Sequence, residues 1–70
     1  MTPEQKRAGI QAKIDHLTSI NWGNTIDAKV YAKAGLTEEA KKITELVARN
    51  ERVITAYKEE LELIENPDAP

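Results

Sequence analysis

The chain is 70 residues long, and its large aliphatic side chains number fifteen (seven Ile, five Leu and three Val), which is a thin core for one small domain. It has no cysteine, so disulfides, thiolate metal sites and a cysteine nucleophile are excluded, and self-association is the remaining way to reinforce so small a fold. Ten basic and twelve acidic residues give a net charge of -2, which argues against a protein whose affinity comes mainly from neutralising phosphates.

The first predicted helix covers residues 3–20. Thr2 stands before Pro3, and Gln5 follows Thr2 by three residues, which is the pattern of a capping box with proline at the first helical position. The apolar residues that follow recur at the spacing of one helix face. They are Ile10, Ile14, Leu17 and Ile20.

A second, shorter helix is predicted over residues 25–34. The Asn-Trp-Gly-Asn sequence at 21–24 is expected to separate it from the first, because glycine and asparagine tolerate positive φ, and Asn24 or Thr25 can cap a new helix. Gly35 is then expected to end this second helix. Its apolar face comprises Ile26, Val30 and either Tyr31 or Ala34.

A third predicted helix covers residues 38–65. Thr37 is placed to cap it, and Glu38 and Glu39 lie in its first turn, where the helix dipole favours acidic residues. Its apolar residues alternate at steps of four and three, which is a heptad seam typical of coiled coils and helical bundles. The seam consists of Leu36, Ala40, Ile43, Val47, Asn50, Ile54, Tyr57, Leu61 and Ile64.

Two features of this seam predict self-association. Leu46 and Val53 lie beside it and widen the apolar stripe beyond that of a two-stranded coiled coil. Asn50 is its one polar member, and such a residue commonly fixes the register or the oligomeric state of packed helices. The predicted oligomer interface comprises Ile43, Leu46, Val47, Asn50, Val53, Ile54, Tyr57, Leu61 and Ile64.

The predicted fold class is all-α, an antiparallel helical hairpin or an unequal three-helix bundle, in one domain over residues 1–70 with a short tail at 66–70. Charge favours antiparallel pairing, which brings Lys6 and Arg7 close to acidic residues late in the third helix. Those acidic residues are Glu59, Glu62 and Glu65.

No signal peptide and no apolar segment of membrane-spanning length is visible in the sequence, so a cytoplasmic location away from membranes is expected.

The ionisable residues form no recognisable catalytic or metal-binding motif. His16 is the only histidine, and its neighbour Asp15 points to a different side of a helix. The late glutamates lack a histidine at the three-residue offset that a di-metal helical bundle uses. There is also no glycine-rich phosphate loop and no nucleophile elbow. We therefore expect no enzymatic activity, no catalytic residue, no metal site and no cofactor.

Trp22 has two interpretations. An aromatic residue in a turn at 21–24 can plug the end of a bundle, which is the favoured interpretation, or it can stand out as a binding anchor. In the second case the start of the 25–34 helix offers free N–H groups, which suit a nucleotide or another small anion. The candidate residues for binding a partner or ligand are Trp22, Asn24, Thr25, Lys29 and Lys33.

The function expected from these features is that of a small non-catalytic interaction protein. It would act as a regulator, inhibitor or adaptor through homo-oligomerisation and protein–protein binding, in the manner of a phage or plasmid accessory protein. An oligomer that binds or sequesters a small anionic ligand is the first alternative. An RNA-binding helical bundle is the second, although acidic residues accompany the bases from which its surface would be built. Those bases are Lys29, Lys33, Lys41, Lys42, Arg49 and Arg52.

Overall fold

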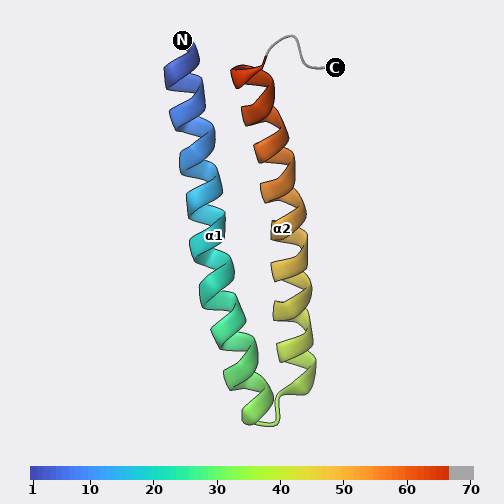
Figure 1. The fold of residues 1–70 in the computed structure, drawn as a ribbon. Helices are drawn as coiled ribbons and strands as arrows, with labels where there is room; N and C mark the ends of the chain where they lie inside the picture. The colour runs from blue at the N-terminus through green and yellow to red at the C-terminus, as the bar shows by residue number, and fades with distance from the viewer. Residues whose placement is uncertain (67–70) are drawn as a thin grey trace.

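Two long helices joined by a short turn make up the fold (Figure 1). The computed structural model describes residues 1–66, with α1 over Pro3–Lys33, α2 over Thr37–Glu65 and no strand in that range. α1 has 31 residues and α2 has 29, so each helix is about 45 Å long. The fold is therefore an all-α antiparallel hairpin, which is one of the two predicted architectures. Of the predicted tail, Asn66 follows α2, and residues 67–70 lie outside the described range.

The helix break predicted at residues 21–24 is wrong, because α1 runs through this segment without interruption. The separate helices predicted over 3–20 and 25–34 are one helix, and the described residues do not form a three-helix bundle. Gly23 costs a helix interior only about 1 kcal/mol relative to alanine. Asn21 forms hydrogen bonds with α2, so contact between the helices outweighs the local preference of this segment.

The start of α1 has the capping box that the sequence predicts. Thr2 Oγ1 accepts a hydrogen bond from the Gln5 N–H at 3.1 Å. The Gln5 side-chain oxygen accepts one from the Thr2 N–H at 2.9 Å. Pro3 then occupies the first helical position, where its missing N–H removes no helical hydrogen bond. The boundary of α1 is thus fixed by side chains within its own first turn.

The turn between the helices centres on Gly35, which has a φ of 83°. Its N–H donates to Ala32 O at 3.1 Å, and the Leu36 N–H donates to Tyr31 O at 2.9 Å, which is the Schellman arrangement of a helix end. Gly35 thus ends a helix, as the sequence predicts. The prediction that Thr37 caps the next helix is wrong, because α2 begins at Thr37 and Leu36 precedes it without a side-chain hydrogen bond.

The core between the helices is thin. Ile14 and Ala40 are the only buried apolar residues in the described range, and no side chain there is completely enclosed. The other seam residues of α2 from Ile43 to Ile64, apart from the buried Asn50, are half-buried. At the open end of the hairpin Arg7 Nε lies 3.6 Å from Glu65 Oε1, which confirms the predicted approach of these oppositely charged ends.

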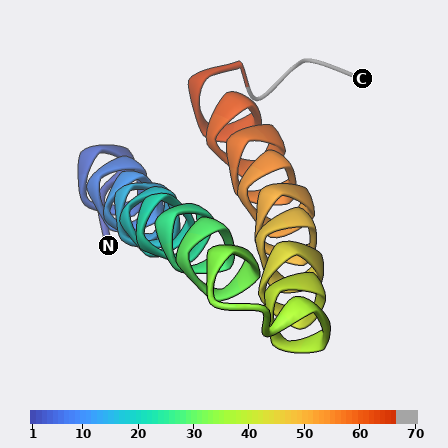
Figure 2. The same ribbon diagram turned by 90° about the horizontal axis from the view of Figure 1, so that it is seen from below.

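The hairpin is elongated, with extents of 50 × 22 × 12 Å, and its two helix axes are inclined to each other (Figure 2). Its radius of gyration is 15.9 Å, whereas a compact domain of this length has about 11 Å. Its accessible surface is 5391 Å², whereas a compact monomer of this mass exposes about 4,400 Å². Over the described residues, neither helix combines the length and the apolar character needed to cross a membrane.

Candidate functional site

Two asparagines lie buried between the helices. Asn21 on α1 is 8% exposed, and Asn50 on α2 is 6% exposed. Asn50 Nδ2 donates to Asn21 Oδ1 at 3.1 Å, and Asn21 Nδ2 donates to Val47 O at 3.2 Å. Asn50 therefore lies inside the packed seam, as the sequence predicts, and the partner for its amide belongs to the same chain.

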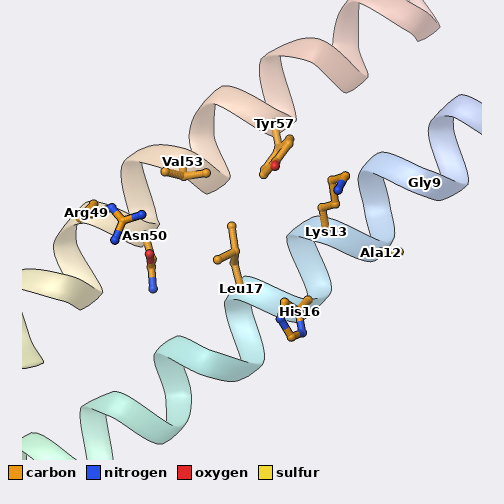
Figure 3. A pocket seen from close by; sticks show the side chains of 9 residues that line it. All are labelled: Gly9, Ala12, Lys13, His16, Leu17, Arg49, Asn50, Val53 and Tyr57. Carbon is orange, nitrogen blue, oxygen red and sulfur yellow. The ribbon is translucent and has the colours of Figure 1, made fainter.

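A groove runs along one face of the hairpin beside this asparagine pair (Figure 3). The side chains of Leu17, Asn50 and Tyr57 point into the space between the helices, whereas His16 points away from α2. A side chain at Gly9 would meet nothing within 4 Å, so this edge of the groove is open. The groove encloses about 670 Å³ and is lined by Gly9, Ala12, Lys13, His16, Leu17, Arg49, Asn50, Val53 and Tyr57.

The groove continues toward the open end of the hairpin. A second stretch of about 500 Å³ shares Gly9 and Lys13 with the first, and we call the two together the long groove. Three bases line it, namely Lys6, Lys13 and Arg49, together with one acid, Glu60. The second stretch is lined by Met1, Gln5, Lys6, Gly9, Ile10, Lys13, Glu60 and Ile64.

The second half of α1 carries large apolar side chains on its solvent side. Trp22, Ile26 and Val30 follow one another at steps of four, so they lie in one line on the helix surface, and we call them the outer row. They are 72%, 41% and 54% exposed. An amphipathic helix has the opposite distribution, with apolar residues toward its neighbour. The least exposed residues of this half are instead polar or small: Asn21, Gly23, Asn24 and Ala28.

The favoured interpretation of Trp22 as a plug is wrong. Trp22 is 72% exposed and lies within an uninterrupted helix, so it closes no end of the hairpin. The exposure of Trp22 follows from its position directly after Asn21. Adjacent residues of a helix point about 100° apart, and the Asn21 side chain is directed at α2.

The structural basis predicted for an anion site is also missing. Residues 24 and 25 lie inside α1, so no helix begins there and no free N–H groups are offered. Asn24 is half-buried, and Thr25 Oγ1 donates to Asn21 O at 2.8 Å. Lys29 and Lys33 are exposed on α1. All five predicted ligand-binding residues share one helix. Thr25 and Lys29 line a small hollow together with Ala28, Thr44 and Val47, and Trp22 is not part of its lining.

Most residues predicted for an oligomer interface pack inside the hairpin. Asn50 and Val47 contact α1 through hydrogen bonds, and Leu46 is 38% exposed. Val53 lines the long groove. The role of this set in contacts between chains stays a prediction. The remaining members are half-buried: Ile43, Ile54, Tyr57, Leu61 and Ile64.

No cluster of metal-binding side chains is found among the described residues. They hold no group of three or more histidine, aspartate or glutamate side chains placed to bind a metal ion. His16 is exposed, and the charged side chains that line the same stretch of the groove are those of Lys13 and Arg49.

Sequence reasoning missed Asn21, Gly9 and Ala12 as parts of the packed or grooved surface. One signal for Asn21 was available, since it follows Ile14 by seven residues, as Asn50 follows Ile43. Two polar residues at matching seam positions of antiparallel helices can meet. The prediction of a turn at 21–24 concealed this match.

Comparison with known proteins finds no matching family model, no matching curated protein and no matching solved structure.

Proposed function

We propose that this chain is a small non-catalytic interaction protein that self-associates through its heptad-patterned helices and binds another protein as a regulator, inhibitor or adaptor. The observation that carries the proposal is the reversed polarity of the second half of α1. There the outer row faces solvent, while Asn21 is buried with hydrogen bonds to α2 and Asn24 is half-buried. Large exposed apolar patches on soluble proteins typically mark sites of protein association.

The thin core supports the self-association part of the proposal. A hairpin that buries only Ile14 and Ala40 as apolar residues in its described range gains little free energy from burial. Its elongated shape leaves a larger surface in contact with water than a compact monomer of this mass has. A second chain that covered this excess would supply the missing burial.

The anionic-ligand alternative has lost the helix start on which it depended, and no observation favours it over protein binding. The RNA-binding alternative has no continuous basic surface to support it, because Glu38 and Glu45 accompany the bases of α2.

Light scattering on the purified chain tests self-association. At micromolar concentration we expect a mass greater than the 7.8 kDa of one chain. A mass of one chain throughout the accessible concentration range would refute this part of the proposal.

A quantitative affinity capture tests the outer row as a protein-binding surface. The baits are the wild-type chain, a Trp22→Ser/Val30→Ser variant and a Gln11→Ser control, which changes an exposed residue of α1 outside the outer row. We expect a partner that the control retains and the outer-row variant loses. A partner set that is identical for all three baits would exclude the outer row.

A further inference from the structure

We infer that the long groove is the surface on which two copies of this chain pair, antiparallel and face to face, to form a four-helix bundle. This inference rests on the self-association proposed above and adds the surface, the register and the charge pairs that fix it. The occupant of the groove is a second copy of the same hairpin, related to the first by a two-fold axis perpendicular to the helices.

The chemistry of the groove suits a helical neighbour. Leu17 and Tyr57 point into it, and Gly9 and Ala12 leave its α1 side low, which allows a second backbone to approach closely. Beyond the lined stretch, Ile20 and Leu46 are each 38% exposed. Ile20 follows Lys13 by seven residues and thus continues the side of α1 that lines the groove.

The internal contacts of the hairpin locate the centre of such a pair. Asn21 meets Asn50, and Arg7 meets Glu65, so Leu17 on α1 lies about level with Ile54 on α2. A two-fold axis perpendicular to the helices at this level brings a residue of one copy to a residue of the other copy that lies equally far from the axis in the opposite direction.

Charges at these mirrored positions are opposite. On α2, Arg49 lies about 8 Å from the level of Ile54 in one direction, and Glu60 lies about 9 Å from it in the other. Arg49 of each copy therefore meets Glu60 of the other, which gives two equivalent pairs for each dimer. Within one hairpin these two residues are about 16 Å apart along the helix and do not pair with each other.

The same register matches the outer parts of the groove. Lys6 lies about 16 Å above the level of Leu17, and Asp27 lies about 15 Å below it. Both lie on the same side of α1, since residues 6, 13, 20 and 27 follow one another at steps of seven. Asp27 of one copy thus approaches Lys6 of the other. Two hairpins paired side by side with their turns at the same end would not bring these opposite charges to the same level.

The available area agrees with such a pair. A standard stable interface buries about 800 Å² on each partner. The broad face of the hairpin, with extents of 50 × 22 Å, is of the size that such an interface covers.

Charge reversal tests the pairing. Arg49→Glu alone places two acidic pairs in the dimer, and Glu60→Arg alone places two basic pairs there, so each variant should dimerise at least about 10-fold more weakly than the wild type. An equimolar mixture of the two variants should form a heterodimer with both pairs restored, at an affinity within about threefold of the wild type. Native mass spectrometry distinguishes the heterodimer by its mass, and analytical ultracentrifugation gives the dissociation constants.

The controls are Arg52→Glu and Glu62→Arg, which reverse exposed charges of α2 outside the long groove and should leave dimerisation unchanged. Circular dichroism on all variants checks that the helix content is equal. If the wild type is a dimer but mixing restores nothing, or if the controls weaken it equally, the groove register is wrong and self-association stands. If the wild type is a monomer, both this inference and the self-association proposed above fail.

Discussion

Asn50 Nδ2 donates a hydrogen bond to Asn21 Oδ1 at 3.1 Å in the middle of the hairpin, where both side chains are buried. Because Asn21 also donates to Val47 O, the pair ties the two helices together at one register. A slip of one helical turn, about 5.4 Å, would separate the two amides. Each amide left buried without a partner costs about 1–3 kcal/mol, so the pair can select one arrangement of the helices.

The first prediction concerns the removal of one asparagine. Asn50→Leu should lower the free energy of unfolding by about 1–3 kcal/mol, because Asn21 Oδ1 then stays buried without its donor. If the Asn50 amide had no partner, the same substitution would instead raise the free energy of unfolding, because leucine suits an apolar seam better than an unpaired amide. Urea denaturation of the variant and the wild type at equal concentration decides between the two expectations.

Removal of both amides is the matched control. Asn21→Leu/Asn50→Leu should be at least as stable as the wild type, because no polar group is left unpaired and leucine has a similar branched shape. The same double variant should lose the unique register, visible as broader amide resonances in its NMR spectrum. A double variant less stable than the wild type would contradict this expectation.

The second prediction tests the continuity of α1. Gly23→Ala should raise the free energy of unfolding by up to about 1 kcal/mol, because alanine favours a helix interior and its Cβ would meet nothing within 4 Å. Circular dichroism during thermal unfolding measures the change. A loss of stability would indicate that residues 21–24 form a turn in solution after all.

The third prediction concerns the turn residue Gly35, whose backbone differs from that of Gly23. Gly35→Ala should lower the free energy of unfolding by about 1 kcal/mol or more, because only glycine adopts a φ of 83° without strain. Unfolding of the two alanine variants side by side provides the measurement. Equal effects at Gly23 and Gly35 would contradict the backbone conformations described for them.

The fourth prediction concerns Trp22. Because its side chain is 72% exposed, Trp22→Ala should change the free energy of unfolding of the dilute chain by less than about 0.5 kcal/mol. A tryptophan that plugged a bundle would instead cost about 3 kcal/mol or more when truncated. Urea denaturation followed by circular dichroism separates these values, and the emission maximum of the wild-type tryptophan should be that of a solvated indole.

Much of the fold could be predicted from the sequence where the signals were local. The capping box at Thr2, the glycine at position 35 and the steps of the α2 seam each depend on residues close together in the chain. The continuity of α1 could not be predicted from the sequence, because Asn21 and Gly23 favour turns by local preference. Asn21 instead forms hydrogen bonds with Val47 and Asn50 of α2, which lie 26 and 29 residues further along the chain.

The candidate surfaces were predicted less completely for the same reason. Asn50 was placed in the seam correctly, but its partner came from a segment assigned to a turn. The outer row on α1 was divided between a turn and a short helix, so its common direction could not be seen. Once α1 is one helix, Trp22, Ile26 and Val30 fall into line.

The central claim is that this hairpin depends on association for its stability, and the melting temperature of the wild-type chain measured over a range of concentrations tests it most directly. Association that occurs only in the folded state stabilises it by mass action. We therefore expect the melting temperature to rise steadily between about 1 μM and about 100 μM chain. A melting temperature that is the same at every concentration, with a cooperative transition, would contradict the claim.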